Sequence, residues 1–320
     1  VNCAHMVDVG GTGPGSQAVA TVDMFQEGIR FIPTRLYRAG RPNREILKLL
    51  AANVRVPDKV LGDVQAQRNA NRIGGRGFLE LVETYGAKVI MRSMSAILER
   101  SEESMRLAIK DLPNGDYVAE DCFDDYGKDT APLKIKVKVT INDDELTVDF
   151  GGSSAQSPSG LNSTFNYTRA YSYFTIKALT VQDKIPQNAG CIRPIKVIAP
   201  EGSLFNPVAP AAVGPRAIMQ QRIVDTILLA MAKATPTRVI ANSSHWANPN
   251  YGGKDPHTGK SFVYYEMLIG GVGARPHKDG ADGLCSSFNL ENIPVEVMEH
   301  NYPLLIERLN FVTDSEGPGQ

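Results

Sequence analysis

The stretch from Leu133 to Phe150 constrains the fold more than any other part of the chain. Residues 133–139 alternate apolar side chains with lysines, which is the period-two pattern of a strand with one buried face. Asn142-Asp143-Asp144 then supplies turn residues, and Glu145–Phe150 returns as a second strand. The pattern predicts an antiparallel hairpin, so the protein must contain a sheet that packs one face against a core.

Helical periodicity dominates the residues before this hairpin. Apolar side chains recur at helical spacing across 44–52 and 87–111. Gly62-Asp63 is expected to open another long helix with Asp63 as its N-cap, and the glycines at 74, 75 and 77 are expected to interrupt or kink it. A helical first third followed by a strand-rich, mixed α/β remainder predicts an α+β protein.

The sequence also predicts several further strands and helices outside these regions. Pro33 and Pro42 exclude a helix around them, so the sequence favours a strand at 27–33 followed by an irregular arm. Further along, the pattern predicts helices at 166–180 and 216–234 and a short strand at 263–269.

The 320 residues are enough for one large domain or two ordinary ones. We expect a single domain over 1–320, with a sub-boundary near 112–116, where the texture changes from helical to strand-rich. The chain starts without Met and ends in the loop-like Asp314–Gln320 segment. We therefore expect both ends to be truncated and the chain to be a fragment of a larger subunit.

Composition excludes several classes of protein. The net charge of −1 gives no electrostatic case for binding nucleic acid or an anionic membrane. No apolar run reaches the roughly 18–20 residues that a membrane span requires. The four cysteines are far apart and form no CxxC pair, so neither a zinc ribbon nor a disulfide scaffold is indicated. Reduced thiols in the cytoplasm are the expectation.

The stretch from Ala4 to Ser16 contains the first residues along the chain that could form a metal or acid–base site. His5 offers a nitrogen ligand or a proton shuttle, and Asp8 offers a hard oxygen ligand or an acceptor that orients the imidazole. Glycines at 10, 11, 13 and 15 permit positive φ or a close approach of a ligand. One interpretation is half of a metal or acid–base site at the end of a strand. The other is a strand that ends in a Gly-rich turn, with His5 held by ordinary hydrogen bonds.

Other polar stretches carry weaker signals. Asp121, Asp124 and Asp125 lack the spacing of an EF-hand, so a solvated loop is favoured over a cation site. The amide-rich helix around 63–72 suits either a polar site or subunit interface, or a solvated face. A second Gly-rich stretch, 270–283, carries carboxylates and cations but matches neither a Walker loop nor a dinucleotide site.

The order of the motifs adds to what each one says alone. His5–Gly11, Glu27–Pro33, Asn53-Val54-Arg55, Gly62–Gln67, Asp149-Phe150-Gly151, Asn188–Ile195, Gly271–Arg275 with Asp279-Gly280, and Asp314-Ser315 follow one another in one sequence. Across essentially all 320 residues the chain resembles the hydantoinase B/oxoprolinase family, which contains the B-type subunit of N-methylhydantoinases and the corresponding subunits of acetone and acetophenone carboxylases.

The resemblance implies an ATP-dependent enzyme that acts with an A-type partner subunit in a hetero-oligomer. ATP with magnesium would bind to that partner, while the B-type subunit would hold a divalent metal: manganese, zinc or iron. The family's ligand set implies His5 as one metal ligand and Asp8 as a further ligand or as the group that orients it. An upstream His-x-x-Asp pair of the family precedes Val1 and is absent from this sequence.

The predicted function is that of a B-type subunit of a hydrolase that opens a small cyclic amide of the hydantoin or 5-oxoproline kind. One alternative is a subunit of an ATP-dependent ketone carboxylase of the acetone or acetophenone type. A second is a non-catalytic interaction subunit that stabilises an ATPase partner. Neither a catalytic residue nor a cofactor-binding residue other than the two metal ligands can be assigned from the sequence.

Overall fold

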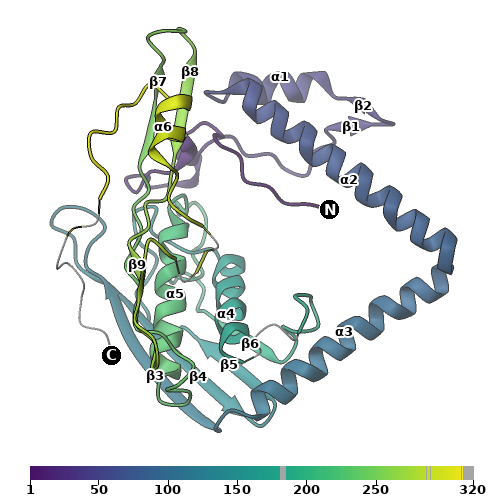
Figure 1. Cartoon of the computed structure of the whole chain (residues 1–320), viewed down its shortest axis with the longest axis vertical. Helices are drawn as coiled ribbons and strands as arrows, with labels where there is room; N and C mark the ends of the chain where they lie inside the picture. The colour runs from purple at the N-terminus through teal and green to yellow at the C-terminus, as the bar shows by residue number, and fades with distance from the viewer. Residues whose placement is uncertain (181–184, 286, 289, 311, 313–320) are drawn as a thin grey trace.

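A four-stranded mixed sheet lies in the lower part of Figure 1, which shows the computed structural model. The structure describes residues 1–180, 185–285, 287–288, 290–310 and 312. The Asp314-Ser315 motif falls outside the described residues. The strand order is β3 (Gly115–Phe123), β4 (Leu133–Asn142), β5 (Glu145–Asp149) and β6 (Ile195–Ile198). The first three strands are antiparallel and β6 runs parallel to β5. The predicted hairpin is confirmed, with Asn142 opposite Glu145.

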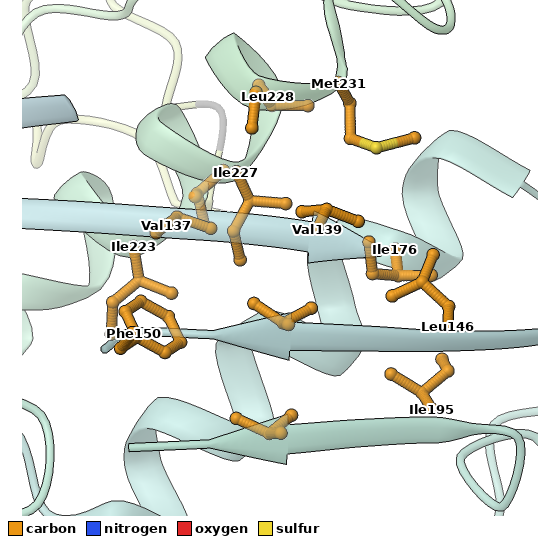
Figure 2. Packing of buried hydrophobic residues seen from close by; sticks show 14 of the residues in the cluster. Val137, Val139, Leu146, Phe150, Ile176, Ile195, Ile223, Ile227, Leu228 and Met231 are labelled. Carbon is orange, nitrogen blue, oxygen red and sulfur yellow. The ribbon is translucent and has the colours of Figure 1, made fainter. Parts of the chain in front are cut away.

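The apolar face of this sheet packs against two helices, α4 (Phe165–Thr180) and α5 (Arg216–Met231). Alternate residues of β4 are buried and the intervening lysines are not, as the period-two pattern predicts. Figure 2 shows side chains of the strands meeting those of the helices. Fully buried members of this sheet core include Val137, Val139, Leu146, Phe150, Ile176, Ile223, Ile227 and Met231.

A smaller apolar cluster holds the N-terminal part of the chain. It joins Leu50 of α1 (Arg44–Ala52), Val60 and Val64 of α2 (Pro57–Tyr85) and Val263 of β8 (Ser261–Tyr265). β8 pairs with β7 (Asn250–Lys254), and both contact the short 3-10 helix η1 (Pro14–Ser16). We call η1, the turn before it, α1, the start of α2 and the β7–β8 hairpin the N-terminal layer.

Two long helices reach away from the sheet. Figure 1 shows α2 and α3 (Ala87–Lys110) meeting at an angle at one side of the molecule, where Gly86 takes a φ of 79°. The end of α3 returns to the sheet core through Met105 and Ile109, which are fully buried. The predicted helices at 44–52, 87–111, 166–180 and 216–234 are thus confirmed, with ends that differ by a few residues.

Two local predictions for the segments after the Gly-rich turn are wrong. The first long helix begins at Pro57, not at Gly62-Asp63, and it continues without a break through the glycines at 74, 75 and 77. Proline suits the first helical position, and the buried Val60 and Val64 lie on the same face four residues apart, which fixes the earlier start.

The expected strand at 27–33 is absent. Asp23 caps a short 3-10 helix, η2 (Met24–Glu27), by accepting a hydrogen bond from the amide of Phe25. Gly28 then takes a φ of 123°, and the amide of Ile29 donates to the carbonyl of Val9 at 2.8 Å. The backbone of this segment therefore hydrogen-bonds to the N-terminal turn instead of to a neighbouring strand.

The remaining described elements are short: β1 (Tyr37–Arg38) with β2 (Arg41–Pro42), β9 (Gly271–Val272) with β10 (Ala281–Asp282), and α6 (Val295–Asn301). Within the described residues, no helix combines the length and the apolar character needed to cross a bilayer. The domain prediction, 1–320 with a sub-boundary near 112–116, stays a prediction.

Candidate functional site

The Gly-rich turn that the sequence singles out is closed by backbone on both sides. Gly10 and Gly11 take φ angles of 87° and 79°, in the left-handed region that favours glycine. A Cβ atom on Gly10 would lie 2.5 Å from the carbonyl oxygen of Asn53, and one on Gly11 would lie 2.7 Å from that of Gln26. The hydroxyl of Ser16 donates to the Gly10 carbonyl at 2.8 Å. These contacts fix the turn in one conformation.

Asp8 is the anion that anchors this turn. Its side chain is completely buried, and it accepts hydrogen bonds from the Arg55 guanidinium and the Arg55 amide, each at 2.8 Å. The Gly10 amide donates to the same carboxylate at 3.2 Å. Arg55 also donates to the carbonyls of Gly10 and Gly11, at 3.1 and 2.6 Å. A buried charge needs such a partner, so Asp8 and Arg55 together hold the turn against the start of α2.

His5 lies in different surroundings from Asp8. It is exposed, and residues 1–9 form no strand, contrary to expectation. No cluster of His, Cys, Asp and Glu in the described ranges brings together the three or more ligands that a metal ion requires. The Asp8 carboxylate already serves a guanidinium, so it fits an anchoring role better than direct ligation. Metal binding by His5 and Asp8 stays a prediction.

A second carboxylate approaches the turn from η2. Glu27 Oε1 accepts hydrogen bonds from the backbone amides of Val213, at 2.6 Å, and Gly214, just before α5 begins. A Cβ on Gly214 would lie 3.0 Å from the same oxygen, which explains the glycine. Burial raises the pKa of Glu27, and this effect exceeds the opposing influence of the two amides and of Arg216.

Tyrosine and glutamine side chains continue the polar lining between α4 and α5. The Tyr167 hydroxyl donates to Gln220 Oε1 at 2.5 Å, and Gln220 Nε2 donates to Ser287 Oγ at 3.3 Å. The Arg216 guanidinium lies 5.5 Å from the centre of the Tyr167 ring, within the range of a cation–π contact. Burial raises the pKa of Tyr167, so this phenol stays protonated at neutral pH.

The N-terminal layer joins this lining through β8. Gln17 Nε2 donates to the hydroxyl of Tyr265 at 3.3 Å. Asn250 Oδ1 lies next to Gly15, is buried, and has no hydrogen-bond partner within the described part of the chain. We use the name turn–α5 site for Glu27, Arg216, Tyr167, Gln220 and Tyr265.

The turn–α5 site combines a half-buried carboxylate of raised pKa with a guanidinium, phenols and amides. Glu27 Oε2 has no hydrogen-bond partner among the residues described, so one carboxylate oxygen is available to a ligand. A carboxyl group whose pKa is raised toward neutrality is suited to accept and return a proton. The Arg216 guanidinium and the Tyr265 hydroxyl donate to oxygen atoms, so the set suits a carbonyl, carboxylate or phosphoryl group.

The sequence indicates the turn beside this site but not the site itself. Asp8 and the Gly-rich turn are conspicuous in the sequence, whereas Glu27 stands only within a motif, and Tyr167 and Gln220 carry no local signal. The usable signal for Glu27 is a carboxylate directly before Gly28, because such a glycine permits the close approach that brings the side chain to α5.

Of the three acidic residues Asp121, Asp124 and Asp125, Asp121 forms an ion pair with Arg222 at 2.7 Å, which connects β3 to α5.

A buried polar group lies further along α5. Gln221 Nε2 donates to both carboxylate oxygens of Asp225 at 3.1 Å. Burial raises the pKa of Asp225 to about 6 and lowers the pKa of the nearby His245 to about 4. His245 Nε2 is buried without a hydrogen-bond partner in the ranges that the structure covers.

Known proteins are similar to this chain along its whole length. The sequence profile of the family described as Hydantoinase B/oxoprolinase matches residues 1–320. A protein of Pseudomonas sp. (strain NS671), named as the B-type subunit of a D-/L-hydantoinase, is 34% identical, and the match covers 100% of this chain and 56% of that protein. The beta subunit of caprolactamase from Pseudomonas jessenii is 29% identical, with 99% and 55% covered. The chain thus spans about half the length of these bacterial relatives.

Two solved structures share the fold. The crystal structure of ATP-dependent caprolactamase from Pseudomonas jessenii superposes with a TM-score of 0.87 at 28% identity, covering 96% of this chain and 54% of that one. Nucleotide-free acetone carboxylase superposes with a TM-score of 0.83 over 93% of this chain and 42% of that one. At 17% identity, the second likeness concerns the fold alone.

Proposed function

The chain belongs to the hydantoinase B/oxoprolinase family, and from this premise we propose that it is part of the B-type subunit of an ATP-dependent hydrolase that opens a cyclic amide. The observation that carries the proposal is the whole-chain similarity to proteins named for hydantoinase, caprolactamase and 5-oxoprolinase activity. Relatives named as B-type or beta subunits imply a partner subunit. We propose that this partner is an A-type subunit and that the complex works in the cytoplasm.

Glu27 is the residue we assign to proton transfer. Opening a lactam adds water to the carbonyl carbon, so a base must take a proton from that water. The carbon–nitrogen bond then breaks, and the ring nitrogen must receive a proton. A carboxylate of raised pKa performs both transfers, first as base and then as acid. The unshared Oε2 of Glu27 is the atom available for this role.

Arg216 and the phenol of Tyr265 are assigned to binding. A lactam carbonyl gains negative charge as water adds, and preorganised donors stabilise that charge. Tyr167 donates its hydroxyl proton to Gln220 and lies against Arg216, so it positions these two side chains before a substrate arrives. Asp8 and Arg55 contribute indirectly, because they fix the turn on which η2 and Glu27 rest.

Membership of the family also leads us to propose two bound groups, ATP with magnesium and a divalent metal ion. ATP with magnesium, bound by the partner subunit, would supply the phosphoryl group that activates the amide carbonyl. A divalent ion, manganese, zinc or iron, bound through the exposed His5 would polarise a carbonyl or phosphoryl oxygen. Asp8 would orient the segment that carries His5, since its oxygens are occupied by Arg55.

Phosphate release by the complete complex of A-type and B-type subunits tests the substrate class. We expect ATP-dependent release with hydantoin, caprolactam or 5-oxoproline, together with appearance of the ring-opened acid. Release that instead requires acetone or acetophenone with bicarbonate would assign the protein to ketone carboxylation. No substrate-dependent release by a complex with an intact ATPase would favour the interaction-subunit alternative.

The variant Glu27→Gln tests the site itself. It keeps the size and the hydrogen-bonding oxygen but removes the base, so kcat should fall by about 10²–10⁴-fold. Glu83→Gln, a matched change at an exposed position of α2, should leave kcat unchanged. Circular dichroism and metal content should match wild type in both variants. Full turnover by Glu27→Gln would remove Glu27 from the reaction.

A further inference from the structure

A hollow of about 350 Å³ opens between α4, α5 and the second Gly-rich stretch. Its walls are apolar: Phe174, Ala178 and Leu179 come from α4, and Val224 and Leu228 come from α5. The volume lies within the range of about 300–1,000 Å³ that is usual for small-molecule sites. Val224 lies about two turns beyond Arg216 along α5, so the hollow is distinct from the turn–α5 site.

Two arginines line the same hollow. Arg238 and Arg275 are both exposed, and neither forms an ion pair with a carboxylate in the described portion of the chain. Arg238 Nη1 makes a single long contact, 3.5 Å, to the carbonyl of Leu179, which leaves most of its donors unused. An apolar hollow bordered by two uncompensated cations attracts an anion that carries an apolar body.

The second Gly-rich stretch fixes one of these arginines. A Cβ on Gly271 would lie 2.8 Å from the carbonyl oxygen of Ala281, and one on Gly273 would collide with that of Ala241. The Ala241 amide donates to the carbonyl of Ala274 at 2.8 Å. This close packing holds the backbone that carries Val272 and Arg275, both of which line the hollow. The glycines, which match no nucleotide motif, therefore hold in place the backbone behind one wall of the hollow.

We propose that this hollow is a binding site for a small monocarboxylate with an aliphatic or aromatic body. The guanidinium groups of Arg238 and Arg275 pair with the carboxylate, since the planar guanidinium matches carboxylate geometry. The hydrocarbon part packs against the α4 and α5 walls. Thr175 and Cys285 are the polar side chains of the lining besides the arginines. The site is separate from the proposed ring-opening chemistry and does not depend on it.

Calorimetric titration of the complete protein with hexanoate tests the proposal, with hexanamide as the neutral probe of the same shape. Hexanoate should bind saturably, and hexanamide should bind at least about tenfold more weakly, as expected when a charge-assisted pair is lost. Arg275→Gln and Arg238→Gln should each weaken hexanoate by about tenfold. Arg76→Gln, an exposed arginine on α2, is the matched control and should bind as wild type.

Ala178→Phe supplies an independent test, because it fills the hollow while leaving both arginines in place. Ala178 is exposed on α4, so the larger side chain fits without disturbing the sheet core, and hexanoate binding should be lost. Glu27→Gln should not change hexanoate affinity, which separates this site from the turn–α5 site. Equal binding of hexanamide, undiminished binding by Ala178→Phe, or no saturable binding of hexanoate would each overturn the proposal.

Discussion

The sheet core and the N-terminal layer are stabilised by different physical means. The sheet core buries many large side chains completely, among them Phe150, Ile223 and Ile227, so its stability comes from apolar burial (Figure 2). The N-terminal layer buries a handful of apolar side chains and relies on the Asp8–Arg55 pair and on close backbone contacts at its glycines. The difference teaches that the N-terminal layer depends on a few specific contacts, whereas the sheet core depends on the volume of the side chains that it buries.

Phe150→Ala should have the largest effect on stability. Phe150 is completely buried and its ring lies 4.5 Å from that of Phe205. Truncation leaves a cavity and should lower the free energy of unfolding by about 3–5 kcal/mol. Urea denaturation monitored by circular dichroism measures this loss. A loss below about 1 kcal/mol would show that the sheet core does not depend on volume in the way that we argue.

Asp8→Asn should come next and should act locally. It leaves the Arg55 charge without its partner, at a cost of about 3 kcal/mol, near the lower end for a buried pair because Arg55 is 30% exposed. Hydrogen exchange should show lost protection in residues 8–16 and 53–60, with β4 and β5 unchanged. Equal loss of protection in the sheet would mean that the two regions unfold as one unit. Glu45→Gln, at an exposed position of α1, should change neither region.

Asp225→Asn tests the carboxyl group that α5 buries against the sheet core. The folded pKa of Asp225, about 6, lies above its ordinary value of 3.8, so the folded state binds a proton more tightly. The stability that this adds is fully present below pH 3.8 and is lost as pH rises through about 6. Between pH 4 and pH 7.5, wild type should therefore lose about 2.4 kcal/mol relative to the Asn variant.

Urea denaturation of both proteins across this pH range measures the difference. His245, whose folded pKa of about 4 lies below its ordinary value of 6.5, acts in the opposite direction: its contribution is present above pH 6.5 and is lost as pH falls toward 4. Because both proteins contain His245, the comparison isolates Asp225. A pH-independent difference would show that Asp225 titrates as it does in the unfolded chain.

Gly75→Ala should have the smallest effect, and it should be stabilising. Gly75 lies inside α2, and a Cβ there meets nothing within 4 Å. Glycine in a helix interior costs about 0.5–1 kcal/mol relative to alanine, so the melting temperature should rise slightly. A fall in stability, or weaker association with the partner subunit, would instead show that another polypeptide approaches α2 closely at this point. Gly62→Ala, in the same helix with an equally open Cβ position, is the matched control.

Most of the sheet core could be predicted from the sequence, because its signals are local. The alternation of 133–139 and the Asn142-Asp143-Asp144 turn placed β4 and β5, and helical spacing placed α1, α3, α4 and α5. Local signals failed at α2 and at 27–33. Glycines 74, 75 and 77 break the pattern but not the helix, and the amide of Ile29 bonds to Val9 instead of to a strand. At 27–33 a distant contact decides the backbone, whereas α2 continues through its glycines because each costs only about 1 kcal/mol relative to alanine.

The candidate site likewise has a part that could be predicted from the sequence and a part that could not. The Ala4–Ser16 stretch was identifiable because histidine, carboxylate and clustered glycine are conspicuous in sequence. The partner of Asp8 was not, since Arg55 lies 47 residues away. The contact of Glu27 with Val213 spans 186 residues, and Tyr167 meets Gln220 across 53. No periodicity in the chain encodes such pairs.

The sequence by itself determined the α+β class, the central hairpin, the main helices, and through its ordered motifs the hydantoinase B/oxoprolinase family. These follow from side-chain periodicity and from short motifs, both of which are properties of neighbouring residues. Only the tertiary structure decided that Asp8 anchors a turn, that Glu27 faces the start of α5, and that Arg238 and Arg275 border one hollow. Each of these depends on where burial of the two apolar clusters brings distant segments together, because a charge or a donor acquires its role from its surroundings in the folded protein.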